Sequence, residues 1–305
     1  MQMKTLTRKP LLALYALAAV LLIVAGVLWW NKKSTDPQNV FWGMVSQSLS
    51  TNSVTINAAD TSTGASVSQA VEYQLGSRSV SHSFTTVTQG ATVVKDEMLG
   101  TPEGDFTRYT SITTNQKSAT GRTLDFTKIL GVWARSTTTP IGKPSAELSQ
   151  AILGSGLPFG GIVVPIGNLT EAQRAQLLGQ IRGQNTYQVA FSTVKKASVN
   201  GRTQYTYDVT MQPILYASMV KRFAQDVGLH DLDQLDVNSF GSQQNIKVRL
   251  TVDVRSRQLV KASVGSGTAG ISQTYTGYGM PVIVNTPHNV ITAAELQSRL
   301  TAIQK

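Results

Sequence analysis

Histidine and acidic side chains are the groups of this sequence that could hold a metal ion or move a proton. The segment 230–233 (HDLD) brings a histidine next to two acids, but it follows an expected helix and we interpret it as a loop. Asp231, Asp233 and Asp236 do not have the spacing of a calcium loop, and no bidentate glutamate follows them. The three histidines lie far apart in the sequence and match no metal-ligand spacing: His82, His230 and His288.

Motifs for nucleophilic catalysis and phosphate binding are also missing from the sequence. It contains neither a G-x-S-x-G turn, nor an S-x-x-K motif with its partner motifs, nor a P-loop. The glycine-rich stretch 154–161 (GSGLPFGG) lacks the lysine that a P-loop needs. No cysteine is present, which excludes disulfides, thiolate ligands and a cysteine nucleophile. We therefore predict that the protein is not an enzyme and uses no metal or cofactor, and keep an extracellular hydrolase as a third hypothesis because serine and aspartate are plentiful.

The composition favours an exported domain rich in strands and turns. Of 305 residues, 14 % are charged and 7 % aromatic, and most of the polarity comes from Ser, Thr, Asn and Gln. The net charge is +10 at pH 7, but five of the positive side chains flank one apolar run and the remainder are spread thinly. Because no dense block of lysine and arginine is interleaved with aromatics, we expect no nucleic-acid partner.

An apolar run near the N-terminus predicts a membrane anchor. Residues 11–30 (LLALYALAAVLLIVAGVLWW) carry no charge, and a helix of this length spans roughly 30 Å, the hydrocarbon thickness of a bilayer. A cleavable signal has a shorter apolar core of about 7–15 residues, followed by a small-x-small site. Two tryptophans and two lysines at the outer end are the expected membrane-interface residues: Trp29, Trp30, Lys32 and Lys33. We therefore predict a retained signal-anchor helix.

The charges around this run predict its orientation. Three basic side chains and the α-amino group precede the run, whereas the two lysines after it are offset by Asp36. This bias predicts a single-pass protein of the cell membrane, with residues 1–10 in the cytoplasm and the C-terminal domain in the extracellular or periplasmic space. Cleavage within the run, at Val24-Ala25-Gly26, is the alternative.

Beyond the anchor, the pattern predicts a polar linker over 31–39 and an extracytoplasmic domain over 40–305. The domain begins with an amphipathic helix over 40–49, because apolar residues recur there at intervals of three and four. From 52 to about 112, apolar and polar residues alternate between glycine-containing turns, which is typical of an antiparallel meander.

The second half of the sequence alternates between helical and strand patterns. The segment 124–133 is compatible with a short helix, and helices are expected over 146–153 and from Thr170, as N-cap, to about 182. Asn200-Gly201 predicts a hairpin turn. The remaining expectations are strands over 187–194, 205–209, 246–254, 259–264, 271–278 and 282–284, and helices over 213–227 and 293–303.

This order of elements resembles the half-barrel lipoprotein-carrier superfamily. Its members are the bacterial outer-membrane lipoprotein carriers and the mycobacterial lipoproteins that bind acylated glycolipids. The resemblance lies between about Thr186 and Pro287, roughly a third of the chain. It depends on three stretches: VNGRTQYTYDVTM leading into PILYASMVKRF, then IKVRLTVDVRSRQLVKASV, and finally ISQTYTGYGMPVIVNTP.

The resemblance implies an α+β fold in which helices cover the concave face of a curved antiparallel half-barrel sheet. Here one N-terminal transmembrane helix precedes it in place of an acylated cysteine. Helices that fill such a face incompletely leave a pocket for acyl chains, so the implied partner is a lipid or other amphipathic ligand. Eight residues are candidates for the pocket lining: Leu157, Phe159, Ile162, Val164, Ile214, Leu215, Met219 and Phe223. The alternative is that all eight belong to an ordinary core.

A second hypothesis keeps the same fold with a filled core. The protein would then be an extracytoplasmic interaction or sensor module that recognises an envelope protein or a wall polymer by its surface. Charge reversal at Lys221, Arg222 or Arg255 should then disturb binding, whereas pocket-filling substitutions should not.

Overall fold

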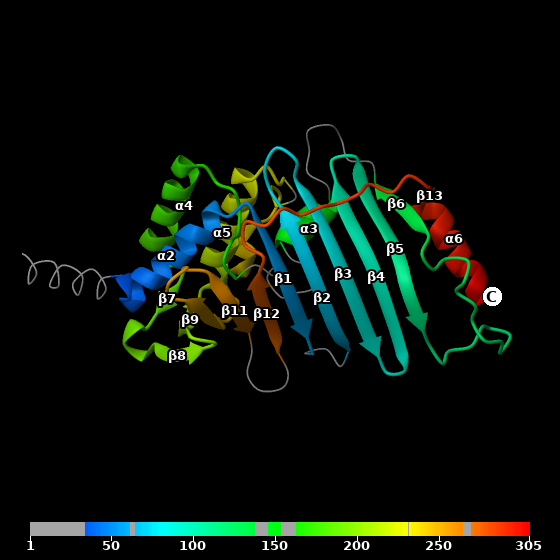
Figure 1. Ribbon diagram of the computed structural model, residues 1–305, viewed down its shortest axis with the longest axis horizontal. Coiled ribbons are helices and arrows are strands. Elements are labelled where there is room, and N and C mark those ends of the chain that lie inside the picture. Colours follow the sequence, from blue (N-terminus) through cyan, green and yellow to red (C-terminus); the bar gives the residue numbers. More distant parts are fainter. Residues whose placement is uncertain (1–33, 62–64, 138–145, 154–162, 231, 265–269) are drawn as a thin grey trace, which may run out of the picture.

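The structure is a computed structural model that describes residues 34–61, 65–137, 146–153, 163–230, 232–264 and 270–305. Over these residues the chain is an α+β protein, in which one sheet of 13 strands carries five α-helices (Figure 1). The predicted anchor over 11–30 and the interface residues Trp29, Trp30, Lys32 and Lys33 lie outside the described residues. Among those that are described, no helix is long and apolar enough to cross a membrane.

The predicted meander is confirmed as five consecutive antiparallel strands. Each strand pairs with the next one along the chain, and tight turns join several of them. The strands are β1 (Ser53–Asp60), β2 (Ser66–Gln74), β3 (Val80–Gln89), β4 (Thr92–Thr101) and β5 (Gly104–Thr113).

The sheet continues beyond β1 with strands from the second half of the chain, because β12 pairs with β1. The order is then β12, β11, β10, β9 and β7, with β8 paired to β9. Figure 1 shows that the sheet turns along its length, so that β9 and β11 lie at a different angle from β2–β5. The bounds are β7 (Gln188–Val189), β8 (Lys195–Val199), β9 (Arg202–Met211), β10 (Ile246–Asp253), β11 (Leu259–Val264) and β12 (Ile271–Thr276).

The other edge of the sheet differs from the sequence expectations. The segment 124–133 contains turns instead of a helix and leads into β6 (Trp133–Thr137), which pairs with β5. Residues 282–284 do not form a strand. They belong to a segment that crosses the outer face of the sheet, which is the face away from α2, α4 and α5. The chain then forms β13 (Val290–Thr292), parallel to β6, and the helix α6 (Ala293–Gln304).

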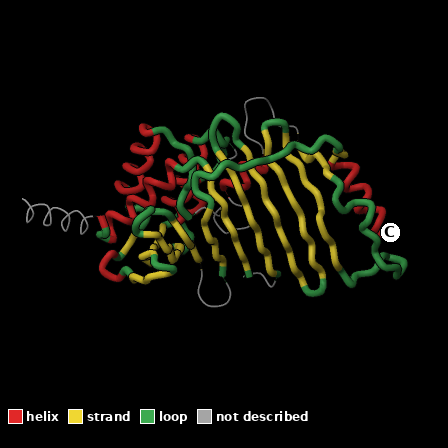
Figure 2. Tube along the Cα trace, in the orientation of Figure 1, coloured by secondary structure: helices red, strands yellow, loops and turns green. Residues whose placement is uncertain are grey.

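Helices gather at the end of the molecule that holds β7–β12, and α6 lies at the opposite end (Figure 2). Three helices of the first group are α2 (Pro37–Ser50), α4 (Glu171–Gly183) and α5 (Pro213–Asp226), and α3 (Ala146–Leu153) lies between the two ends. Each corresponds to a predicted helix, although α2 begins at Pro37, inside the predicted linker. Asp36 explains this earlier start, because its carboxylate accepts a hydrogen bond from the backbone N–H of Asn39 as an N-cap.

The ring of Phe41 explains why α2 packs on the domain. It makes edge contacts with Tyr187, Phe191 and Tyr207, at centroid distances of 5.3–5.9 Å. The strand expected over 187–194 is shorter than predicted and ends at Val189. The chain then forms a 3₁₀ turn over Phe191–Thr193, which brings the ring of Phe191 against Phe41. Tyr205 and Tyr207 also donate hydrogen bonds to the carbonyls of Thr35 and Pro37, which fixes the start of α2 on β9.

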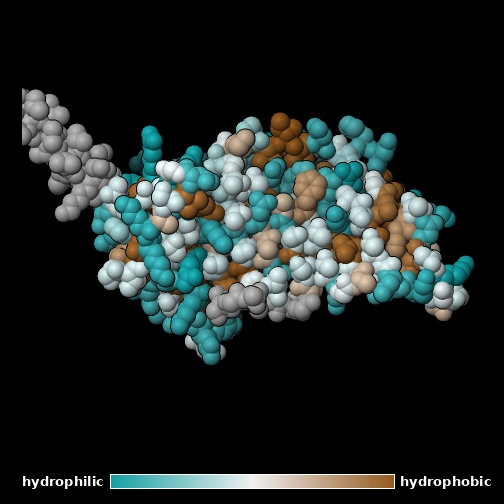
Figure 3. All heavy atoms as spheres, turned by 60° about the horizontal axis from the view of Figure 1, so that its bottom comes forward, coloured by the Kyte–Doolittle hydropathy of each residue, from teal (hydrophilic) through white to brown (hydrophobic). Residues whose placement is uncertain are grey.

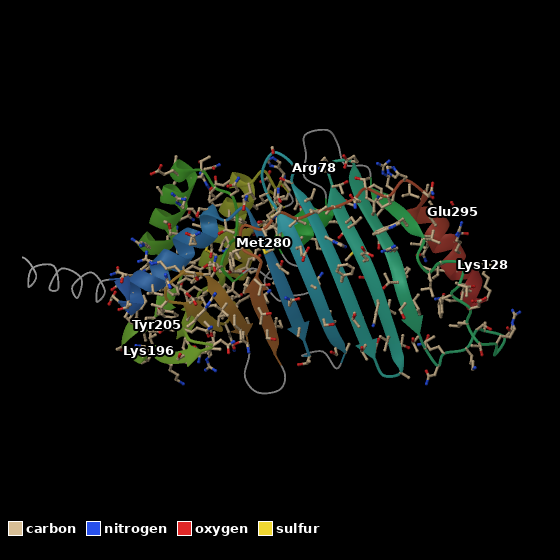
Figure 4. All side chains as sticks on the ribbon, in the orientation of Figure 1. Arg78, Lys128, Lys196, Tyr205, Met280 and Glu295 are labelled. Carbon is tan, nitrogen blue, oxygen red and sulfur yellow. The ribbon has the colours of Figure 1, made fainter. Side chains whose placement is uncertain are left out.

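The segment after β12 crosses the outer face of the sheet, opposite to the face on which the helices pack. Val282 N–H donates to Gln74 Oε1 on β2, and Val284 packs with Val80, Leu99 and Phe106. Met280 lies on this segment, in front of the sheet in Figure 4, and is 63 % exposed. Figure 3 shows small hydrophobic patches among hydrophilic residues over the face that it presents.

Candidate binding site on the helix-covered face

The two halves of the sheet differ in how well helices cover the same face. In β9–β12 this face carries side chains that are fully buried under α2, α4 and α5, such as Tyr207, Leu250 and Tyr275. The same face continues onto β1 and β2. Tyr275 of β12 is in register with Ile56 of β1, and Ile56 is in register with Val71 of β2. We call this face the concave face.

On β2–β5 the concave face carries three rows of side chains that run across the strands. Cross-strand partners follow directly from the register, since residues in register on neighbouring strands point to the same face. The first row is apolar, the second is polar and the third is mixed: Val67, Val87, Val94, Ile112; then Gln69, Thr85, Asp96, Tyr109; then Val71, Ser83, Met98, Thr107.

The first two rows are only half-buried, unlike the face under α2, α4 and α5. Of the helices described, α3 is the one that packs across β2, β3 and β4. Its Leu148 and Ile152 are buried in the main core, so α3 closes the side of this area that adjoins the core. We call the two half-buried rows the concave strip. Four strands about 4.8 Å apart give each row a length of roughly 14 Å.

A carboxylate fixes the start of α3 on the sheet. The two carboxylate oxygens of Asp105, a buried residue of β5, accept hydrogen bonds from the backbone N–H groups of Ala146 and Glu147, at 3.1 and 3.2 Å. Negative charge at a helix N-terminus also interacts favourably with the helix dipole. Asp105 therefore holds α3 against the strands that carry the concave strip.

Glu147 shares this region with two other carboxylates. Burial, together with the negative charges of Asp105 and Asp96, raises the pKa of Glu147 to about 7. Burial also raises the pKa of Asp96, more than hydrogen bonds from Thr85 lower it. The first turn of α3 thus carries a carboxyl group, that of Glu147, whose charge changes close to neutral pH.

The predicted pocket residues on α5 fall into two groups. Met219 and Phe223 have no exposed surface, and Val164 is buried beside them in the main core. The hydroxyl group of Tyr187 donates to Met219 Sδ at 3.3 Å, and the ring of Phe223 packs on the backbone of Gly167. Ile214 and Leu215 are half-buried. The other three candidates lie outside the described residues: Leu157, Phe159 and Ile162.

The described residues of the segment 230–233, which are 230, 232 and 233, follow α5 as part of a turn, as the sequence indicates. His230 Nδ1 lies 2.9 Å from Asp233 Oδ2, and Asp233 also accepts a hydrogen bond from Gln225. The side chains of His230 and Asp233 are 63 % and 37 % exposed. Over the part of the chain that the structure describes, no three histidine or acidic residues come close enough to hold a metal ion.

Sequence reasoning missed the concave strip. The alternation in β2–β5 marks Val87 and Val94 as lying on one face, but alternation alone does not say whether helices cover that face. The candidates on α5 follow instead from the apolar face of an amphipathic helix, and the structure places Met219 and Phe223 of that face in the core. The sequence signal that indicates the strip is the pair of valines, Val87 and Val94, in strands of alternating apolar and polar residues.

The fold and the strip describe an α+β protein with an open sheet and an incompletely covered helix-bearing face. No protein-family model matches the chain, and no curated protein matches it. Among solved structures, LprF from Mycobacterium bovis is 12 % identical with a TM-score of 0.43, over 82 % of this chain and 96 % of LprF. The Mycobacterium tuberculosis lipoprotein LppX is 16 % identical with a TM-score of 0.38, over 80 % of this chain and 98 % of LppX.

Proposed function

We propose that the protein is a membrane-anchored extracytoplasmic protein that binds a lipid or another amphipathic molecule on its concave face. The observation that carries the proposal is the concave strip, which is half-buried, whereas most side chains of β9–β12 on the same face are buried. Binding sites for small molecules combine an apolar lining with a few polar groups, and the strip has this composition.

The two rows of the strip suit the two parts of an amphipathic ligand. Val67, Val87 and Val94 offer a continuous apolar surface along which an acyl chain can lie. Thr85 and Asp96 lie next to that surface and can accept or donate hydrogen bonds to a polar headgroup. An apolar molecule without a polar end would place no polar group beside Thr85 and Asp96, which favours an amphipathic ligand.

Two adjacent valines of β4 provide a matched test. Val94 points into the concave strip, and Val93 points to the opposite face; both are half-buried. The chain from Ser34 onward contains every residue of the three hydrophobic clusters, and this portion can be purified without the anchor. A native mass spectrum, followed by solvent extraction, identifies any lipid that copurifies.

We expect the protein to carry a lipid or to take up a hydrophobic dye. Val94→Trp should abolish this binding by filling the strip, whereas Val93→Trp should leave it intact. A clean apo mass without dye uptake, or equal effects of the two substitutions, would refute the proposal and favour the interaction module.

The test of that alternative is best placed at Arg255. Lys221 donates to the carbonyl of Leu235, and Arg222 pairs with Asp226, so charge reversal at either position disturbs internal contacts. Arg255 is exposed in the turn between β10 and β11. Loss of a protein partner on Arg255→Glu, with unchanged lipid content, would indicate surface recognition.

A further inference from the structure

A hollow of about 460 Å³ lies at the base of α2, on the side that faces α4 and the β10–β11 turn. Its walls come from three parts of the chain that are distant in sequence. Two of its eight lining residues are arginines: Ser34, Asn39, Trp42, Gly43, Ser46, Leu178, Arg182 and Arg257. The hollow is separate from the concave strip, with which it shares no residue.

The first arginine is held by an aromatic ring. The guanidinium group of Arg182, in the last turn of α4, lies 4.7 Å from the ring centroid of Trp42 on α2. This cation–π contact restricts the side chain and leaves its N–H groups at the guanidinium edge for another partner.

The second arginine is held by a glycine of α2. A Cβ atom at Gly43 would lie 2.5 Å from Cδ and 3.0 Å from Nε of Arg257, so the Arg257 side chain lies directly on the α2 backbone. Arg257 itself has a positive φ of 54° in the turn after β10, and its N–H donates to the carbonyl of Asp253. The turn and the glycine together point the side chain at the hollow.

Asp36 and Asp253, the acidic residues closest in sequence to the lining residues, accept hydrogen bonds from other groups. Asp253 Oδ1 accepts hydrogen bonds from the N–H groups of Arg255 and Ser256 and from the Ser256 hydroxyl. Asp36 caps α2 through the N–H of Asn39. Among the described residues, neither Arg182 nor Arg257 takes part in an ion pair. Within the described part of the chain, the hollow is therefore lined by two positioned arginines that have no ion-pair partner.

The sequence places this hollow beside the predicted anchor. Ser34, which lines it, follows Trp30 by four residues, and four residues span at most about 14 Å. The hydrogen bonds from Tyr205 and Tyr207 fix the start of α2 on the sheet. The hollow therefore stays close to the point where the chain from the predicted anchor reaches the domain.

We propose that this hollow binds the phosphate group of an anionic phospholipid headgroup at the outer surface of the membrane. Arginine binds phosphate oxygens through paired N–H groups, and two guanidinium groups from different elements can grip one phosphate. The site would orient the domain on the bilayer. This inference depends on the anchoring part of the proposed function, and not on ligand binding at the concave strip.

The experiment compares two double variants of the full chain. Arg182→Gln with Arg257→Gln removes both charges of the hollow. Arg174→Gln with Arg255→Gln removes the same number of charges from the same helix and the same turn, at positions that do not line the hollow. Each protein is placed in nanodiscs of equal parts phosphatidylcholine and phosphatidylglycerol, and the lipids that stay bound are identified by native mass spectrometry.

We expect the wild type and the control variant to retain phosphatidylglycerol in preference to phosphatidylcholine. The variant of the hollow should lose this preference, with roughly tenfold weaker binding of short-chain phosphatidylglycerol in solution. Equal retention by the two double variants would overturn the proposal. Binding of millimolar inorganic phosphate that is lost in the variant of the hollow, without any preference of the wild type for phosphatidylglycerol, would overturn the membrane as the source of the phosphate.

An alkaline carbonate wash of membranes tests the anchor separately. A chain that resists the wash and shows no preference for phosphatidylglycerol refutes the headgroup site but not the anchor. A chain that is washed off refutes the anchor, and the proposal that the hollow lies at the membrane surface fails with it.

Discussion

The ring of Phe223 lies directly on the backbone of Gly167. A Cβ atom at Gly167 would come within 2.5 Å of Cε2 and 2.6 Å of Cζ of this ring, and within 3.2 Å of Cγ1 of Val227. The N–H of Gly167 also donates to the carbonyl of Ser48 at the end of α2. Residue 167 therefore connects α2 and α5 at a point where a side chain has no space.

We predict that Gly167→Ala destabilises the protein by about 1–3 kcal/mol, because Phe223 is fully buried and cannot move aside. Chemical denaturation measures this loss. Gly179→Ala is the control, because a Cβ atom there meets nothing within 4 Å and alanine favours the helix α4. A neutral Gly167→Ala would show that α5 shifts easily, which would favour an expandable core around Met219 and Phe223.

The buried carboxylate of Glu97 supports a second stability prediction. Its two oxygens contact His82 Nε2 at 2.8 Å and Arg108 Nε at 2.6 Å, and the guanidinium group of Arg108 lies 4.5 Å from the ring centroid of Trp133. Glu97→Gln should lower the free energy of unfolding by about 1–3 kcal/mol, because a charged hydrogen bond in a buried site is lost.

The matched control is another pair between neighbouring strands. Asp208 and Arg249 are more than half exposed, so Asp208→Asn should change the free energy of unfolding by less than about 0.5 kcal/mol. Equal effects of the two substitutions in urea denaturation would show that burial of Glu97 contributes little.

The raised pKa of Glu147 predicts a pH dependence of stability. Because its pKa is about 7 in the folded protein and 4.5 in the unfolded chain, the folded state binds the proton more tightly. The free energy of unfolding should therefore fall as the pH rises from about 4.5 to 7, by up to roughly 1.4 kcal/mol per pH unit. Glu147→Gln should remove this contribution and make the protein more stable than the wild type at pH 8.

Thermal unfolding of both proteins at pH 5 and pH 8 measures this difference. Glu103→Gln is a control of opposite sign, because a hydrogen bond from Thr101 lowers the pKa of Glu103. That carboxylate stabilises the folded state above the pKa of the unfolded chain, and the stabilisation is lost as the pH falls. An unchanged pH dependence in Glu147→Gln would place the titrating group elsewhere.

Gly43→Ala tests the position of Arg257 without changing any charge. The added methyl group must displace the Arg257 side chain, which is flexible, so the fold should tolerate it and α2 should gain helix propensity. We predict weaker retention of phosphatidylglycerol in nanodiscs, with no loss of thermal stability. Retention equal to that of the wild type would show that the hollow does not depend on where Arg257 lies.

Local patterns predicted most of the helices and strands correctly. The period-two alternation of β1–β5, the Asn200-Gly201 turn and the N-cap at Thr170 each depend on neighbouring residues, and the structure confirms all three. The expectations that failed depend on distant contacts. Residues 282–284 alternate like a strand, but they pack on Val80 and Phe106 across the outer face, while β13 forms further on, beside β6.

The far edge of the sheet shows the same dependence on tertiary contacts. Lys128 and Glu295 are distant in the sequence, yet Figure 4 places them at the same end of the molecule. Arg299 joins them, because it donates to the carbonyl of Lys128 and to the carboxylate of Glu295. These contacts hold α6 over the turns of 124–133, where sequence periodicity alone was compatible with a helix.

The sequence by itself determined the elements, the apolar run of the predicted anchor and the order of strands in the meander, because periodicity, capping and turn chemistry act over a few residues. Only the tertiary structure decided which apolar residues became core and which stayed half-buried. Met219 and Phe223 are closed in because α2, α4 and the segment around Gly167 pack on α5. Val87 and Val94 have equally apolar side chains, but the covering of their face depends on where α3 docks, and Asp105 fixes that across 41 residues of chain.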